Sequence, residues 1–482
     1  MRLIKKIILY LIVLFLLIVA IGVGIAHVYQ DEIEQLAIQN INMQLRTPIE
    51  VEDIEFSLIK KFPYASLELK NLMVLDAFQK DTLLKAEKIF LKLNSIDLYR
   101  KSYNLQQLEI HNGFTRISVN EEGIPNYQIW HSQSDSFQVK SLDLNHVSLT
   151  NIHIKYSDTK SNLYISTLAS QTELKGTIEN SIFSAQINGD FETDFIKVSQ
   201  DKYLEEKKLS TWVSLDASIQ HSSFNGSVQT NDLELKFNGA VQNGYAINVI
   251  GSKIDINTIL DYVPKQFLSS IQSYQFDGIA DLNINLENQK KTKLPVTIHA
   301  DFNIENGSIQ SNFPWQIKDV EIKGIYNNGK LKTNESSIIS LQSFKCQLNG
   351  EYLKGSLTYS NFNNPLIKTQ FNTELDLADI KQWGYELPIQ DVSGRAKITA
   401  NYKGKIGLKN DFKKDFEQAE KSADVQLIKT SFFFNPFAPF HDIDASLRLR
   451  NNHLEIDSLK GSIGEESKLK FIGAIENLFN AN

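Results

Sequence analysis

The sequence predicts a mainly β protein, in which an N-terminal transmembrane helix precedes a long curved antiparallel β-sheet that forms an apolar groove, with few short helices. The first observation is the alternation of apolar and polar residues in many segments after residue 46, the pattern of strands with one apolar and one polar face. The second is a set of Asn-Gly pairs, which favour tight antiparallel hairpins because asparagine and glycine accept positive φ. The predicted turns are Asn188-Gly189, Asn225-Gly226, Asn238-Gly239, Asn243-Gly244, Asn306-Gly307, Asn328-Gly329 and Asn349-Gly350.

The first element is a membrane segment. Residues 7–26 form an uncharged run of 20 residues, which matches the ~20 residues that cross ~30 Å of hydrocarbon. Basic residues precede the run and acidic residues follow it, so residues 1–28 are expected to be a cytoplasmic tail and a transmembrane anchor, with the main body on the other side of the membrane. A cleaved signal peptide is the alternative, although the run is longer than the ~7–15 residues typical of one.

The next elements are short helices. Residues 29–46 are expected to form an amphipathic helix, because apolar residues recur every four positions from Ile33 to Leu45 before Pro48 ends the pattern. Three further short helices are expected, at 258–271, 377–383 and 405–421. The last is densely charged and is interpreted as a solvated helix or a linker.

The β sequence divides into three regions. Two segments match at an offset of 123 residues, Ala300–Ile304 with Ala423–Leu427 and Lys318–Ile322 with His441–Ala445. A repeated strand module extends a sheet rather than building a unique catalytic pocket. The predicted regions are an N-terminal β region at 47–130, a middle β region at 131–275, and repeated modules in 276–482, at about 278–340 and 394–463.

The scarcity of helices bears on function, because each strand has an apolar face that something must cover. Either a second sheet fills the interior, or one sheet curls and leaves a long apolar groove, and the pattern alone favours neither. A large exposed apolar surface normally marks a binding site, and an acyl chain is the natural ligand of such a groove beside a membrane. The groove candidates are Leu67, Leu69, Ile89, Leu91, Leu282 and Ile284, for each of which ordinary core packing is the alternative.

Composition argues against several other classes. Cys346 is the only cysteine, which excludes a disulfide framework and a CxxC redox site. The net charge of −7 gives no reason to expect nucleic acid, since phosphate binding needs a basic patch. The chain has no HExxH, GxSxG or P-loop motif. We therefore expect no catalytic residues, no metal site, no cofactor and no enzymatic activity.

One aromatic segment stands out. Five phenylalanines lie between residues 432 and 440, around Pro436 and Pro439. The functional interpretation is a hydrophobic plug or a loop that contacts a membrane. The alternative is a core cluster at a bend of the sheet, because aromatic residues dominate cores.

The order of these features resembles the AsmA-like family of Gram-negative envelope proteins. The similarity covers most of the chain, and it is best at residues 1–130 and 420–482. No single motif is diagnostic, but the ordered combination is. It includes Leu45–Val51, Phe62–Leu72, Leu84–Ile89, Leu105–Ile110, Asn120–Asn126, His441–Ile443, Leu454–Ile456, Leu459–Gly461 and Phe471–Ala474.

The resemblance implies a repeating β-groove fold that conducts or buffers glycerophospholipids between the two membranes. The chain ends at Asn482, soon after a repeat, whereas many relatives are longer, so a complete bridge between membranes is not expected from the resemblance alone. The predicted function is that of an inner-membrane-anchored periplasmic lipid-binding protein whose partners are phospholipid acyl chains and the inner membrane. The alternative is a non-enzymatic assembly factor that contacts envelope proteins through strand edges.

Overall fold

The structure is a computed structural model. It describes residues 42–43, 45–57, 60–61, 64–94, 105–129, 141–179, 182–198, 201–218, 221–242, 244–262, 274–289, 296–310, 317–348, 350–379, 390–405, 412–434, 437–464 and 467–477. The predicted membrane anchor at 1–28 and most of the predicted helix at 29–46 lie outside the described residues. Among the residues that are described, no helix is long and apolar enough to cross a membrane.

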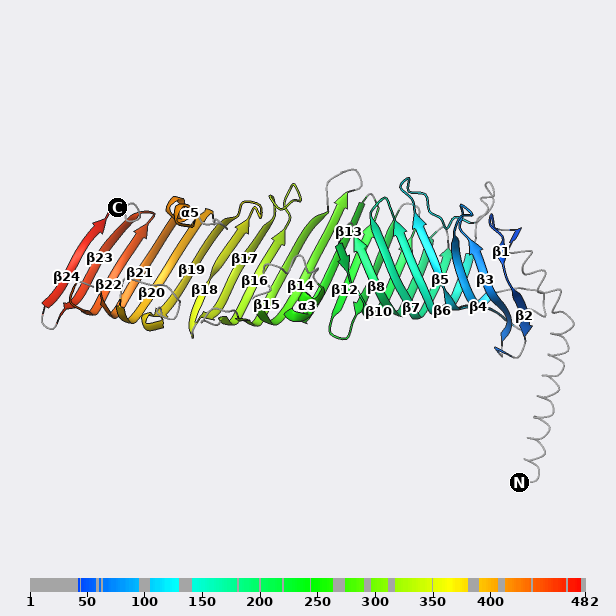
Figure 1. Cartoon of the computed structure of the whole chain (residues 1–482), viewed down its shortest axis with the longest axis horizontal. Coiled ribbons are helices and arrows are strands. Elements are labelled where there is room, and N and C mark those ends of the chain that lie inside the picture. The colour runs from blue at the N-terminus through cyan, green and yellow to red at the C-terminus, as the bar shows by residue number, and fades with distance from the viewer. Residues whose placement is uncertain are drawn as a thin grey trace, which may run out of the picture. The chain divides into compact units, whose positions relative to one another are not determined.

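The chain divides into two compact units, with the boundary between Gln242 and Asn243. The strands of unit 1 are β1 (Ile49–Glu50), β2 (Asp53–Ser57), β3 (Tyr64–Leu75), β4 (Thr82–Asn94), β5 (Leu105–Val119), β6 (Ser141–Asp158), β7 (Leu163–Glu179), β8 (Ile182–Val198), β9 (Asp201–Tyr203), β10 (Lys207–Ala217), β11 (Ser222–Gln229) and β12 (Glu234–Val241). They are drawn from blue to green in Figure 1.

Unit 2 continues the same style of structure with two short helices. Its elements are β13 (Gly244–Asp255), α3 (Ile256–Tyr262), β14 (Gln275–Gln289), β15 (Thr297–Gln310), β16 (Ile317–Asn327), β17 (Ile338–Leu348), β18 (Glu351–Ser360), β19 (Leu366–Asp376), β20 (Gln390–Lys405), α5 (Phe412–Gln418), β21 (Glu420–Phe433), β22 (Phe440–Arg450), β23 (His453–Ile463) and β24 (Ser467–Ile475). The predicted mainly β class with few helices is confirmed.

Most strands pair antiparallel with their sequence neighbours, as predicted, but β1 pairs with β3, β10 pairs with β8, and one pair is parallel. β5 pairs with β6 in parallel, from Leu108 opposite Val147 to Val119 opposite Asp158. The prediction of a purely antiparallel sheet was therefore wrong at this point. The reason is the long connection between β5 and β6, residues 120–140, which is long enough to return the chain to the end where β5 began.

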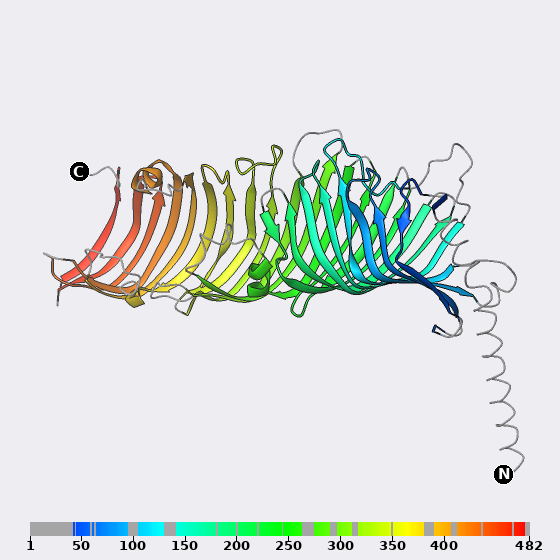
Figure 2. The ribbon, with the colours of Figure 1, turned by 45° about the vertical axis from the view of Figure 1, so that its right-hand side comes forward.

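Each unit bends along a line of kinked residues. Asn112 and Asn151 have φ of 52° and 53° and lie in adjacent positions of β5 and β6. In unit 2, Asn306 and Asp319 have φ of 53° and 48°, and register shifts flank them. Bulges of this kind bend a strand. Figure 2 shows the strands as arcs rather than straight ribbons.

The apolar side chains lie on the inside of the bend. Val320 and Ile443 each follow a kinked aspartate and are almost fully buried, although no second sheet packs on them within the described residues. Side chains on the inside of a bend converge and bury one another, whereas those on the outside spread apart. The apolar face is therefore the concave one.

Kinks and side-chain contacts recur at the 123-residue offset. Asp319 and Asp442 share a φ of 48°. The Ile298 amide donates to Asn328 Oδ1 at 2.9 Å, and the Lys421 amide donates to Asn451 Oδ1 at 3.1 Å. The two segments thus have the same local construction at corresponding positions.

Four of the seven predicted Asn-Gly turns were wrong. Gly189, Gly226, Gly239 and Gly307 lie inside strands β8, β11, β12 and β15. The reason at Gly226 is close approach, because a Cβ there would lie 2.2 Å from the Trp212 carbonyl oxygen. Gly329 and Gly350 do lie in turns, and Gly244 begins β13.

The other predicted helices are partly described. α3 covers the start of the 258–271 prediction, a short 3₁₀ turn lies at 377–379, and α5 lies within the 405–421 prediction. The remaining residues of these three predictions lie outside the described part of the chain, apart from residue 405 and residues 419–421 at the two ends of the third prediction.

The bend can be tested at Gly394, which has a φ of +102°. A Cβ added at this position would lie 2.6 Å from the Lys429 carbonyl oxygen. Gly394→Ala is expected to lower the free energy of unfolding by about 1–3 kcal/mol from backbone strain, and further from the clash. Urea denaturation measures this. Gly350→Ala is the matched control, because it shares a positive φ of 91° but meets nothing within 4 Å. Equal losses in the two variants would contradict a close-packed bend.

Candidate functional site

The candidate site is the apolar face of unit 2, the concave side of β13–β24. Antiparallel partners place their side chains on the same face, and the register runs Val249–Ile284–Ala300–Tyr326 across four strands. The face includes Ile247, Val249, Leu282, Ile284, Leu286, Phe302, Ile304, Ile322, Phe344, Leu353, Leu357, Phe371, Ile398, Val425, Leu427, Leu447 and Ile456.

Little covers this face. The strands of unit 2 belong to one sheet, and the only other regular elements described there are two short helices and a 3₁₀ turn. α3 packs against β13 and β14, and α5 packs against β20. Within the described residues, therefore, no second layer lies over most of the face, and Leu282 and Ile284 remain half-buried rather than enclosed.

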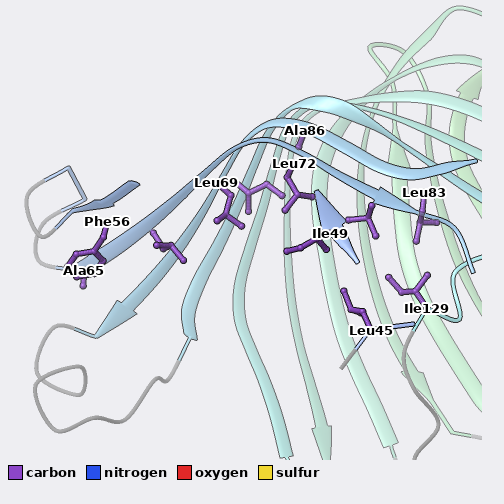
Figure 3. Packing of buried hydrophobic residues seen from close by; sticks show 12 residues of the cluster. Leu45, Ile49, Phe56, Ala65, Leu69, Leu72, Leu83, Ala86 and Ile129 are labelled. Carbon is purple, nitrogen blue, oxygen red and sulfur yellow. The ribbon is translucent and has the colours of Figure 1, made fainter. Parts of the chain in front are cut away.

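The four N-terminal groove candidates have a different environment. Leu67, Leu69 and Ile89 are only 2–4% exposed and belong to a closed hydrophobic cluster, with Leu91 packed against it. Figure 3 shows side chains of this cluster under the arch of β3 and β4. The structure thus separates the six predicted residues into a core set at this end of unit 1 and the pair Leu282 and Ile284 on the apolar face of unit 2.

Three segments close the N-terminal cluster. β1 and β2 both pair with β3, and they contribute Ile49 and Phe56 to it. The crossover between β5 and β6 contributes Ile129, whose carbonyl oxygen accepts a 2.7 Å hydrogen bond from the Arg46 amide. The crossover is the connection that the parallel pairing of β5 and β6 requires. This pairing, which the pattern did not predict, therefore brings in a segment that helps to cover the core.

Glycines make the floor of the apolar face of unit 2 smooth. Gly324 lies directly opposite Phe302, and a Cβ on Gly324 would be 2.3 Å from the Phe302 ring. Gly355 lies opposite Phe371, and a Cβ on Gly355 would be 2.9 Å from the ring of Phe344. Rings that lie over glycines add apolar area without projecting far from the sheet.

Cys346 provides a natural reporter on the same face. It alternates with Phe344 on β17 and lies opposite Leu353 of β18. Its thiol is half-buried, and burial raises its pKa. A raised pKa lowers the thiolate fraction, so this thiol is expected to react slowly with aqueous reagents.

The opposite face is polar and laced with ion pairs. Lys345 pairs with Glu321 at 2.7 Å, and Arg395 contacts both Glu351 and Glu374 at 2.9 Å. The depressions described on this side have mixed polar lining, such as Asn303, Glu321 and Lys345. The charges that keep the sheet in water are thus segregated from the apolar face.

No catalytic or metal constellation emerges in the described part of the chain, where no group of three His, Cys, Asp or Glu residues is placed to hold an ion. The absence of enzymatic activity stays a prediction.

The sequence reasoning missed one feature at the rim of the apolar face. Phe416 of α5 stacks on Tyr402 of β20 at 6.1 Å, and Lys421 Nζ donates to the Phe416 carbonyl oxygen at 2.7 Å. The many charged residues of 405–421 led to the interpretation of a solvated segment, so the packing of Phe416 on Tyr402 was not predicted. Phe412 and Phe416, four residues apart, were the available signal of an apolar helix face.

A scan of the chain against models of protein families, a search of curated proteins and a search of solved structures find no match. The AsmA-like resemblance therefore stays a prediction.

Proposed function

We propose that the protein binds glycerophospholipids by burying their acyl chains against the apolar face of unit 2, as an inner-membrane-anchored periplasmic protein that carries or buffers lipid in the cell envelope. The observation that carries this proposal is a concave apolar face that spans all the strands of the unit and has no second layer over most of it within the described residues. The location and the anchor rest on the charge asymmetry around residues 7–26 and on the family resemblance.

The dimensions suit an acyl chain. Twelve strands at a spacing of ~4.8 Å give a sheet on the order of 50 Å wide. One leaflet of a bilayer core is about 15 Å thick, half of ~30 Å. The face is therefore longer than one acyl chain, and a lipid is able to move along it without leaving apolar surface.

The energetics require no specific polar contact. Each CH₂ group moved from water to an apolar surface contributes ~0.8 kcal/mol. An acyl chain of even modest length is then held by its own burial, while the head group stays in water. Nothing in the sequence suggests nucleotide binding, so net transport would follow a lipid gradient or a partner's energy source.

The test compares two variants of one strand. Leu282→Asp/Ile284→Asp places two carboxylates on the apolar face of β14, and Asn283→Asp/Asn285→Asp places the same charges on its opposite face. A photoactivatable phosphatidylcholine, with the reactive group in its acyl chain, is added to the full chain. We expect crosslinking to fall at least tenfold in the first variant only, because buried carboxylates are costly.

Cys346 supplies a second readout without mutation. Bound lipid is expected to slow alkylation of its thiol by a water-soluble maleimide, since the acyl chain would cover the neighbouring face. If a folded protein takes up no lipid and Cys346 reacts at the same rate throughout, lipid binding is refuted. The assembly role through protein contacts would then be favoured.

A further inference from the structure

The connection between β21 and β22 exposes an unusual aromatic tip. Residues 431–440 contain no charged side chain in a protein that is 22% charged. Phe434 and Phe437 are 36% and 52% exposed and stack on each other at 5.9 Å. The Phe437 amide donates to the Phe434 carbonyl oxygen at 2.8 Å, which holds the two rings on one turn. We use "aromatic tip" for Phe434 and Phe437.

The aromatic tip adjoins the apolar face of unit 2. On either side of it in the chain, Phe432 and Phe440 are cross-strand partners that stack at 4.7 Å. Thr430 and Ile443, the next partners in register, are almost fully buried. Aromatic and apolar side chains therefore lead from the exposed tip to the floor of the face. Both interpretations from the sequence therefore apply in part, because Phe432, Phe433 and Phe440 belong to strands, whereas Phe434 and Phe437 remain exposed.

Basic side chains lie on neighbouring strands. Lys468 is exposed on β24 and lies opposite Ser462 of β23. Ser462 in turn lies opposite His441 of β22, the residue that follows Phe440. Two strand spacings therefore separate the backbones of Lys468 and His441, a distance of about 10 Å. Lys470 lies directly opposite Lys460, and both are exposed. Asp444 of β22 lies opposite Lys460 on its other side. The described register partners of Lys468 and Lys470 are Ser462 and Lys460, neither of which is acidic, so these two lysines suit an external anionic partner.

We propose that the aromatic tip inserts into the surface of a lipid bilayer, so that acyl chains pass from the membrane over this rim onto the apolar face of unit 2. Exposed aromatic rings without nearby charges in the loop sequence suit the boundary between head groups and hydrocarbon. Lys468 and Lys470 would meet anionic head groups. The insertion itself rests on the loop alone, whereas the passage of lipid rests on the proposed function.

The experiment places a fluorophore at the tip. In full chain carrying Cys346→Ser, Phe437→Cys or Leu331→Cys is labelled with nitrobenzoxadiazole. Leu331 is the matched control, because it is 58% exposed in the turn between β16 and β17, and this turn lies at the opposite ends of the strands from the aromatic tip. The protein is reconstituted into phosphatidylcholine vesicles that contain doxyl-labelled lipid, with and without phosphatidylglycerol. We expect several-fold stronger quenching at 437 than at 331, and a further increase with phosphatidylglycerol.

A second background separates insertion from lipid uptake. With Leu282→Asp/Ile284→Asp, quenching at 437 is expected to persist, because the bilayer rather than a bound lipid supplies the quencher. Its loss in that background, or equal quenching at 437 and 331 in the parent, would overturn insertion. Neither result would bear on whether the apolar face binds lipid, which crosslinking measures separately.

A variant that keeps the native cysteine tests the passage of lipid. Phe434→Ser/Phe437→Ser is expected to slow lipid uptake from vesicles several-fold, while uptake of a short-chain phosphatidylcholine supplied as monomers stays unchanged. Leu331→Ser should alter neither rate. Equal slowing for both lipid forms would point to a damaged apolar face and overturn the role of the tip in lipid entry.

Discussion

Leu69→Ala is expected to lower the free energy of unfolding of unit 1 by about 2–5 kcal/mol. Leu69 is only 2% exposed and lies opposite Ile89 in the closed cluster, so its loss leaves a cavity that β1, β2 and the crossover cannot readily fill. Urea denaturation gives the change in free energy, and hydrogen exchange of the β3 and β4 amides assigns it to this end of the chain.

The matched control for this truncation is Leu282→Ala on the apolar face of unit 2. Leu282 is half-buried with no second layer over it in the described part of the unit, so the same truncation removes fewer contacts and encloses no cavity. We expect its cost to be less than half of that at Leu69. Equal costs would mean that the apolar face is as tightly enclosed as the core, which would also remove the main support for lipid binding.

Acid is expected to destabilise unit 1 through Glu109. This carboxylate is buried on the polar side of β5, where it accepts hydrogen bonds from Lys92 and from Lys61, the latter at 2.9 Å. Burial by itself raises the pKa of Glu109. The hydrogen bonds and charges of the two lysines outweigh burial and lower the pKa from 4.5 to about 2.

The sign of the pH dependence follows from that direction. Because the pKa of Glu109 is lower in the folded state than in the unfolded state, the stabilisation is complete above pH 4.5 and is lost as the pH falls through about 2. A shift of this size corresponds to about 3 kcal/mol at neutral pH. Glu109→Gln is expected to remove this part of the pH dependence and to lower the free energy of unfolding at pH 7 by a similar amount, since Lys92 stays buried without a carboxylate.

Asp53→Asn is the control for the acid prediction. The pKa of Asp53 is also lowered, first by its hydrogen bond with Lys70, but its carboxylate is exposed and screened by water. It should therefore change the acid midpoint little. If unfolding of Glu109→Gln kept the parent's slope between pH 4.5 and 2, another carboxylate would have to account for the acid lability of unit 1.

The sequence by itself determined the strands and the direction in which their side chains face. A period of two is a local property of the chain, so Leu282 and Ile284 are assigned to one face and Asn283 to the other before any contact is known. The mainly β class, the scarcity of helices and the antiparallel meander follow from the same alternation and from short connections.

Only the tertiary structure decided what covers each face. Leu67 and Leu69 show the same alternation as Leu282 and Ile284, yet the first pair lies in a closed core and the second on an uncovered face. The difference comes from β1, β2 and Ile129, which lie far from some of their partners in the sequence.

The Asn-Gly pairs show a similar limit of local sequence, because the same dipeptide occurs both at turns and inside strands. The pair at 328–329 leads into a turn that includes Gly329. The pair at 225–226 lies in mid-strand, where a neighbouring backbone comes too close for any residue larger than Gly226. Alternation encodes which way a side chain points. Coverage, bending and the parallel pair depend on chain segments that meet only in three dimensions, and no local pattern specifies them.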